Sequence, residues 1–167
     1  MPRMRTVLAM TAAVVLLAIP ATARASTTAN QRAEANMVAA INEVRAQHGL
    51  DALRRSDSLA DSAGRYSHWL IANDTFRHLS SIQASSQFSM LGEALEWHSG
   101  RRFDVRGTLN RWMASPGHRA IVLSSVMRLQ GAGVTRGRMG SRRATVWVLH
   151  VGRIHPPGAQ LTSLPLP

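Results

Sequence analysis

The stretch Trp112–Leu123 contains a histidine at a break between two expected helices, and this residue could take part in chemistry. A helix should end near Ala114, because Pro116 disfavours the α conformation of the residue before it. Gly117 allows a tight turn, and His118 then begins a new apolar helical run. The positive end of that helix disfavours an imidazolium ion, so His118 should stay neutral and able to bind. The alternative is a tight loop with a surface histidine.

Two other segments carry polar groups of interest. Phe76 and His78 follow a helix at a spacing of two, which sends both side chains the same way if the backbone is extended. Glu93 and Glu96 lie in a short apolar segment and face opposite sides of a regular strand, so one of them points inward or into a cleft. No serine stands in a Gly-x-Ser-x-Gly setting, and Ser115 is expected to be a turn residue.

Helices and strands must position these residues, and the spacing of apolar side chains predicts both. Apolar residues recur every three or four positions in four segments, which we expect to be helical: 31–48, 57–72, 103–114 and the segment from residue 118. Short apolar runs predict three strands: 90–97, 131–134 and 144–152. The last two should pair as an antiparallel hairpin across a glycine- and arginine-rich turn at 135–143. This mixture predicts an α+β fold, a three-layer α-β-α sandwich with a small central antiparallel sheet.

The beginning of the chain has the pattern of a secretory signal peptide. Arg3 and Arg5 precede an apolar segment that is too short for a membrane span, and Ala23–Ala25 fits a small-x-small cleavage site. This cleavage pattern disfavours an uncleaved anchor, so the mature protein should be secreted and should not be an integral membrane protein. The predicted segments are a signal peptide at 1–25, a single folded domain at 26–155 and a proline-rich tail at 156–167.

The composition is strongly basic and lacks cysteine. All 20 basic residues are arginines, against 9 acidic residues. Such an excess implies attraction to anionic partners such as lipid headgroups, acidic cell-envelope polymers or a protein, although a GC-rich genome also favours arginine. No long basic run or interleaved aromatic residues accompany it, so nucleic acid is not an expected partner. The arginines expected to bind anions lie in two segments: Arg101–Arg102, and Arg136, Arg138, Arg142 and Arg143.

Several short motifs occur together in a fixed order. The series opens with an N-x-x-R-x-x-x-G-L-x-x-L pattern that begins at Asn42, and it ends with a tryptophan-containing strand. Between them stand Phe76-Arg77-His78, Gly92-Glu93, Ser115-Pro116-Gly117-His118 and Gly131–Val134. This combination resembles the CAP superfamily, also called the SCP domain, over residues 35–153. The superfamily includes cysteine-rich secretory, antigen-five and plant pathogenesis-related proteins.

The resemblance implies an α-β-α sandwich with an open cleft that two histidines and up to two acids line. Carried over by position, His78, Glu93 and His118 would line this cleft and should lie within roughly 8 Å of one another. The second acid would fall at Ser115, which would line the cleft in its place, so that acid is missing. Ala94 stands where an asparagine is frequent. These departures, with the absence of disulfides, match short bacterial secreted members.

Two functions from different classes remain open. The first is an extracellular binding module for a lipid, an anionic polymer or a protein. The alternative is a metal-dependent peptidase or esterase, in which His78, Glu93 and His118 hold a divalent metal such as zinc and leave a position for water. The same trio could instead form a hydrogen-bonded cluster in which Glu93 orients an imidazole. The other histidines are expected to be exposed or structural, with His98 at the cleft edge: His48, His68, His98, His150 and His155.

Overall fold

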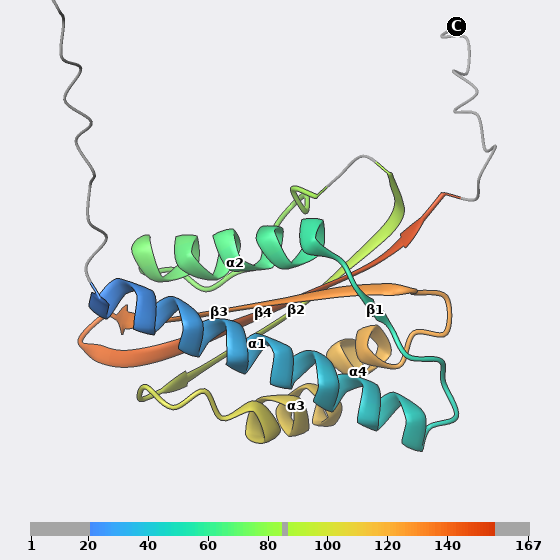
Figure 1. Cartoon of the computed structure of the whole chain (residues 1–167), viewed down its shortest axis with the longest axis horizontal. Coiled ribbons are helices and arrows are strands. Elements are labelled where there is room, and N and C mark those ends of the chain that lie inside the picture. Colours follow the sequence, from blue (N-terminus) through green and yellow to red (C-terminus); the bar gives the residue numbers. More distant parts are fainter. Residues whose placement is uncertain (1–20, 85–86, 156–167) are drawn as a thin grey trace, which may run out of the picture.

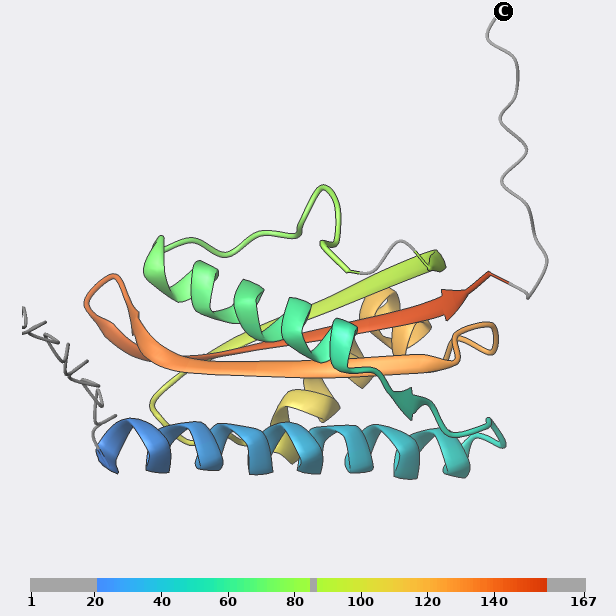
Figure 2. The ribbon, with the colours of Figure 1, turned by 45° about the horizontal axis from the view of Figure 1, so that its top comes forward.

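The computed structural model describes residues 21–84 and 87–155, with side chains from residue 28 onward. Its helices are α1 (Ala21–Gln47), α2 (Asp57–Ala72), α3 (Val105–Ala114) and α4 (Pro116–Val122). Its strands are β1 (Arg54–Arg55), β2 (Phe88–Ser99), β3 (Leu129–Met139) and β4 (Arg142–Ile154). The sheet lies between two helical layers, with α2 on one face and α1, α3 and α4 on the other (Figures 1 and 2). The predicted α-β-α sandwich is therefore confirmed.

The four strands lie in the order β1-β3-β4-β2. The central strand β4 pairs antiparallel with both β3 and β2, as the predicted hairpin requires. The short β1 was not predicted and pairs parallel to β3, so that Arg54 lies opposite Leu129 and the sheet is mixed. The strand β3 continues to Met139, so most of the segment predicted to be a turn belongs to β3 and β4.

Each face of the sheet has its own apolar core. The face toward α2 buries side chains of that helix against β2 and β4: Ala63, Tyr66, Leu70, Leu95, Val146 and Val148. The opposite face carries the larger core, to which α1, α3, α4 and the sheet contribute, with Met37, Ile41, Leu109, Trp112, Val122 and Trp147 among its members. Burial of apolar area on both faces stabilises the domain without any disulfide.

The helix α2 lies unusually close to β3 because three glycines face it. A Cβ on Gly131 would collide with the backbone at Leu59 and Ala60, and one on Gly133 would collide with the backbone at Ala63. Further along β3, a Cβ on Gly137 would meet the side chain of Ile71. The glycines in this strand therefore allow close packing of a helix on a sheet, and they do not mark a turn.

A buried arginine of α1 holds the far end of α4. Arg45 is 1% exposed, and its Nη1 donates to the carbonyls of Val122 at 2.8 Å and Ser124 at 3.0 Å. Its Nε donates to the carbonyl of Asp51 at 2.9 Å. These bonds satisfy carbonyl groups that a helix leaves free at its C-terminus. They fix α4, the helix that carries His118, against the core.

The first helix begins earlier than the apolar pattern indicated. It starts at Ala21, so residues 26–30, which we expected to be loose, are helical and the predicted cleavage point lies within the helix. Asn30 stabilises this first part, because its side-chain amide donates to the carbonyl of Val134 at 3.0 Å. Most of the predicted signal peptide (residues 1–20) and the predicted tail lie outside the described residues. Within the described part, no helix has the length and apolar character needed to cross a membrane.

Candidate functional site

Glu93 is the centre of a cluster of polar side chains on the α2 face of the sheet. It lies on β2 directly opposite His150 of β4. Its Oε2 is 3.0 Å from Nε2 of the fully buried His150, and its Oε1 is 2.8 Å from Nδ1 of His78. The backbone amide of Leu79 also donates to Oε1, at 3.0 Å. One carboxylate thus connects a buried imidazole to an exposed one.

The loop that follows α2 carries His78 over this carboxylate. Ser56 caps the start of α2, and the hydroxyl of Tyr66 in that helix donates to the carbonyl of Arg77 at 2.5 Å. Together with the bond from the Leu79 amide to Glu93, this contact fixes the loop on both sides of His78. The histidine is consequently positioned although its side chain is 59% exposed.

The hydrogen bonds determine the protonation of the cluster. Burial acts to raise the pKa of Glu93, but the bonds from His150, the Leu79 amide and His78 together outweigh it and hold that pKa below its usual value. Glu93 is therefore an acceptor, and Nδ1 of His78 and Nε2 of His150 donate to it. In neutral His78 the exposed Nε2 then carries a lone pair, which can accept a proton or a hydroxyl hydrogen.

The second predicted histidine approaches the first from the other side of the edge strand β2. His118 lies in the first turn of α4, and its ring centroid is 6.1 Å from that of His78. Burial lowers the pKa of His118, and the nearby His78 lowers it further, while Glu96 acts in the opposite direction. The imidazoles of His78 and His118 and the carboxylate of Glu93 therefore meet at β2. The structure brings together His78, Glu93 and His118.

The structure places Ser115 between α3 and α4, where it ends one helix and begins the next. Its amide lies 3.2 Å from the carbonyls of both Arg111 and Trp112, and its side chain makes no capping hydrogen bond to α4. Among the described contacts, none joins Ser115 to His78 or Glu93. It is a turn residue, as its sequence setting indicates.

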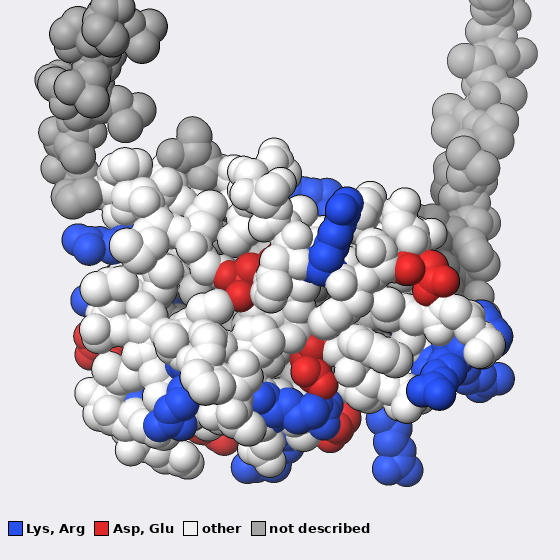
Figure 3. All heavy atoms as spheres, turned by 180° about the vertical axis from the view of Figure 1, so that it is seen from behind, with Lys and Arg blue, Asp and Glu red and all other residues white. Residues whose placement is uncertain are grey.

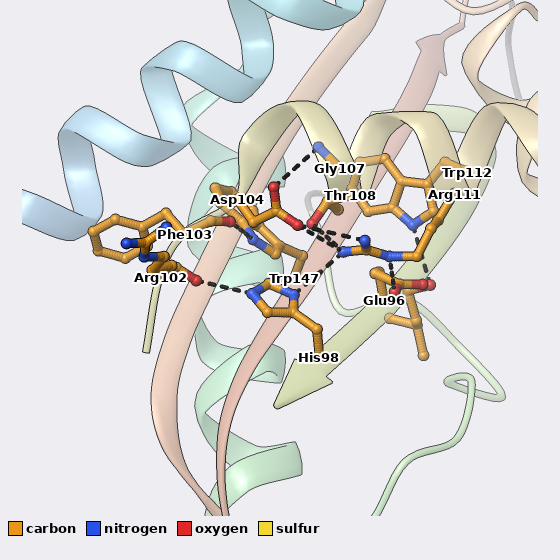
Figure 4. Close-up of polar contacts among 11 residues, drawn as sticks. Glu96, His98, Arg102, Phe103, Asp104, Gly107, Thr108, Arg111, Trp112 and Trp147 are labelled. Carbon is orange, nitrogen blue, oxygen red and sulfur yellow. Dashed lines mark hydrogen bonds and ion pairs between the residues drawn. The ribbon is translucent and has the colours of Figure 1, made fainter. Parts of the chain in front are cut away.

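Glu96 belongs to a separate network on the opposite face of the sheet (Figure 4). It lies opposite Trp147 and forms an ion pair with Arg111 of α3. The same guanidinium reaches Asp104 at 3.3 Å and approaches Nδ1 of His98 at 3.4 Å. Nε2 of His98 donates to the carbonyl of Arg102 at 2.8 Å. Arg111 therefore already engages Glu96, which leaves Glu93 as the carboxylate of the candidate site.

The arrangement does not fit a three-ligand zinc site. Both oxygens of Glu93 accept hydrogen bonds from imidazoles, and His78 directs its Nδ1 to Glu93 rather than to His118. In residues 21–84 and 87–155, no group of three or more His, Cys, Asp or Glu side chains is arranged so that it could hold a metal ion. The contacts correspond instead to the hydrogen-bonded cluster that the sequence left open.

His150 is the member of the cluster that the sequence analysis did not assign to the site. It lies in a nearly continuous apolar run and is fully buried, with its Nδ1 lacking a hydrogen-bond partner among the described residues. A buried imidazole needs at least one polar partner. A histidine within an apolar central strand was therefore the feature of the sequence that could have indicated a polar cluster. Only the register of β2 and β4 identifies Glu93 as the partner of His150.

The predicted anion-binding arginines lie on the β3–β4 hairpin. Arg136 is half-buried, with its guanidinium over the ring of Phe103 at 4.3 Å, so it supports the fold of this end. Arg138 is exposed and donates to the carbonyl of Ser141 at 2.7 Å. Arg142 and Arg143 are exposed as well. Three of the four arginines are thus accessible.

Comparison with known proteins agrees with this architecture. Residues 38–151 match the family described as CAP, the cysteine-rich secretory protein family. No curated protein is significantly similar to the chain.

Two bacterial structures share the fold, each at 21% sequence identity. An extracellular SCP-domain protein of Bacillus anthracis aligns with a TM-score of 0.64, covering 81% of this chain and 45% of that one. An outer surface protein of Borrelia burgdorferi aligns with a TM-score of 0.57, covering 71% of this chain and 90% of that one.

A cysteine-rich secretory protein of Staphylococcus aureus aligns with a TM-score of 0.53 at 18% identity, covering 74% of this chain and 38% of that one. The chain thus spans less than half the length of the Bacillus and Staphylococcus proteins. At these identities the likeness concerns the fold alone. The family match, which extends over most of the described residues, shows that this chain belongs to the CAP family.

Proposed function

We propose that this CAP domain acts outside the cell as a binding module for anionic surfaces, namely acidic envelope polymers or anionic lipid. The observation that carries the proposal is a group of exposed arginines at one end of the molecule. We call this group the arginine patch, and it consists of Arg101, Arg102, Arg138, Arg142 and Arg143.

The fold brings the two halves of the arginine patch together. The amide of Gly100 donates to the carbonyl of Arg143 at 2.8 Å, which places the loop after β2 beside the hairpin. Arg138 and Arg143 lie directly opposite each other on β3 and β4. Like charges in such a cross-strand pair repel, so the pair is costly without an anionic partner. Figure 3 shows arginine side chains gathered at this end of the molecule.

The arginine patch is accessible, and no carboxylate of the described residues neutralises its charge. None of its five arginines takes part in an ion pair among the described residues. The nearby Asp104 is engaged by Arg111. A hollow of about 710 Å³ lies beside the patch, and residues 98–102 and Asp104 line it. Guanidinium groups around a hollow suit carboxylate or phosphate groups on a larger polymer.

The extracellular location is part of the proposal. It is supported by the signal-like residues 1–25 and by similarity in fold to an extracellular protein of Bacillus anthracis and an outer surface protein of Borrelia burgdorferi. The alternative, a metal-dependent hydrolase, has less support because Glu93 directs its oxygens to His78 and His150. Stoichiometric zinc in the purified protein, lost in H78A, would favour that alternative.

The test compares two triple variants that remove the same amount of charge. R138Q/R142Q/R143Q should lose most binding to anionic vesicles and to an acidic wall polymer, whereas R54Q/R119Q/R153Q should retain it. Binding of the unmodified protein should weaken as salt rises, because ions screen exposed charges over about 10 Å at 0.1 M. Equal loss in the two variants would show attraction by net charge alone and would contradict a specific patch.

A further inference from the structure

A groove of about 420 Å³ lies between α2 and the loop that follows it, next to His78 and away from the arginine patch. The helix contributes Ser62, Arg65, Tyr66 and Trp69, and residues 77–80 with Gln83 supply the other wall. Leu79 is the single lining residue without a polar side-chain atom. The walls thus combine polar groups with the apolar surface of aromatic rings and aliphatic stems, and such a mixed lining suits a ligand that has both polar groups and an apolar face.

Two guanidinium groups give the groove a positive charge. Arg77 lies over the ring of Trp69 at 5.4 Å from its centroid, a cation–π contact that orients the side chain. Its backbone is fixed at the same time by the hydroxyl of Tyr66. Arg65 donates through Nη2 to the carbonyl of Gln83 at 3.3 Å, which holds the facing wall. Neither arginine forms an ion pair with a carboxylate in the described part of the chain.

Preoriented arginines that lack an acidic partner favour an anionic ligand. A guanidinium group matches the planar oxygens of a carboxylate or the oxygens of a phosphate. The groove is far larger than such a group alone, so it has room for a neutral body attached to that group. Trp69 stacks against Tyr66 with the ring centroids 5.8 Å apart and remains 37% exposed, so the uncovered part of its indole offers apolar surface to this body. The hydroxyl of Ser80 and the amide of Gln83 can hydrogen-bond to its polar groups.

His78 adds an acceptor to the lining of the groove. Its Nδ1 donates to Glu93 at 2.8 Å, so in the neutral ring its Nε2 is unprotonated. That nitrogen can accept a hydrogen bond from a ligand hydroxyl. The groove thus combines two cations, an exposed indole and several neutral hydrogen-bonding groups, which are the contacts that a charged sugar requires.

From this arrangement we infer that the groove binds an anionic saccharide unit, a sugar ring that carries a carboxylate or a phosphate. Arg65 and Arg77 hold the anionic group, Trp69 contacts the ring, and Nε2 of His78 accepts from a hydroxyl. This site differs from the arginine patch in its residues and in its demands on the ligand. The groove recognises one saccharide unit with a defined shape. Its binding is independent of whether the arginine patch binds a ligand.

Tryptophan fluorescence and calorimetry test this inference with small probes. Trp112 and Trp147 are fully buried and Trp97 is half-buried on β2, so a change in emission on binding is assigned to Trp69 only if it vanishes in W69F, as we expect. The probes are trigalacturonate for the carboxylate class, glucose 6-phosphate for the phosphate class and uncharged maltotriose as the control. Binding of either charged probe but not of maltotriose is expected, and the stronger of the two identifies the anionic group.

Variants locate the binding. R65Q and R77Q should each weaken the charged probe at least tenfold, because each removes a charge-assisted contact. R119Q, which removes an exposed arginine outside the groove, should change the affinity less than twofold. R138Q/R142Q/R143Q should bind the small probe normally even if it no longer binds polymer, so failure of the proposed function and failure of this inference are distinguishable.

Four results would overturn the inference. The first is equal affinity for maltotriose and the charged sugars, and the second is unchanged affinity in both R65Q and R77Q. The third is failure of every charged probe to bind at millimolar concentration. The fourth is a loss of affinity for the small probe in R138Q/R142Q/R143Q that equals the loss in R65Q and R77Q, which would place binding at the arginine patch. Far-ultraviolet circular dichroism of each variant shows whether it is folded, and R77K provides a more conservative change than R77Q.

Discussion

At the scale of single residues, the carboxylate of Glu93 satisfies three donors. Two of them come from side chains far apart in the sequence, and His150 has no access to water that could replace the bond. A buried donor that loses its acceptor costs the free energy of desolvation. The cluster is therefore as much a part of the fold as a candidate site.

The first prediction concerns this shared acceptor. E93A should lower the free energy of unfolding by about 1–3 kcal/mol for the buried His150 donor alone, with a smaller loss from Leu79 and His78. Urea denaturation followed by circular dichroism measures this change. E43A, which removes an exposed glutamate of α1, is the matched control and should change stability by less than about 0.5 kcal/mol. Equal stability of the two variants would mean that Glu93 does not hold the cluster.

The sequence predicted part of this site. His78, Glu93 and His118 were reached through motifs, and they converge because a helix exit, an edge strand and a helix start meet at β2. His150 could not be assigned to the cluster because its partner depends on strand register, which no local pattern determines. Ser115 was predicted to be a turn residue on its local setting, and the structure agrees.

At the scale of elements, the contact between α2 and β3 depends on the absence of side chains. Gly131 and Gly133 lie directly beneath the backbone of the helix. Since α2 leads into the loop that carries His78, this spacing also sets the height of the loop above Glu93. The packing of one helix thus determines the geometry of the candidate site.

The second prediction tests this close packing. G133A should lower the melting temperature strongly, because its Cβ would overlap backbone atoms of Ala63 and Gly64 that cannot move independently. G64A is the matched control on the facing helix, where a Cβ meets no atom within 4 Å. It should leave stability unchanged or raise it by up to about 1 kcal/mol, because alanine favours a helix. Differential scanning calorimetry compares the two, and equal melting temperatures would contradict the packing argument.

Other elements show why the sequence gave an incomplete account of the fold. The glycine-rich composition of residues 135–143 indicated a turn, but Gly137 is needed where Ile71 approaches β3. The two-residue strand β1 is too short to show a periodicity of its own. It forms because the backbone amide of Ser56 donates to the backbone carbonyl of Gln130 in β3. The start of α1 was placed too late because apolar periodicity does not report polar contacts such as that of Asn30.

At the scale of the whole molecule, acid should destabilise the folded protein. The pKa of His118 is lowered in the fold by burial and by His78. As the pH falls below the usual 6.5, His118 of the unfolded chain therefore binds a proton before His118 of the folded chain does, which favours unfolding. Glu93 acts in the same direction below its usual 4.5, since its pKa is also lowered in the fold. Glu34 opposes this change, because burial raises its pKa and the folded chain therefore binds its proton first.

The third prediction follows from these directions. The melting temperature should fall as the pH is lowered from 7.5 to 4, first through the titration of His118 and later through that of Glu93. H118Q, which cannot take up this proton, should lose less stability than the unmodified protein between about pH 6.5 and 5. Thermal melts at matched ionic strength measure the difference. Parallel curves for the two proteins over this interval would contradict a neutral His118 in the fold.

The central position of β4 has a consequence for the time at which this protein can acquire its structure. During synthesis from the N-terminus, β4 is the last of the described strands to appear, yet β2 and β3 reach each other only through it. Nearly all of the chain must therefore be present before the sheet can form, and pairings between such distant segments form slowly. A ribosome-bound chain that ends before residue 142 should remain open to proteases. Late completion of this kind would serve the extracellular location that we propose, because a polypeptide crosses a narrow export channel before it folds.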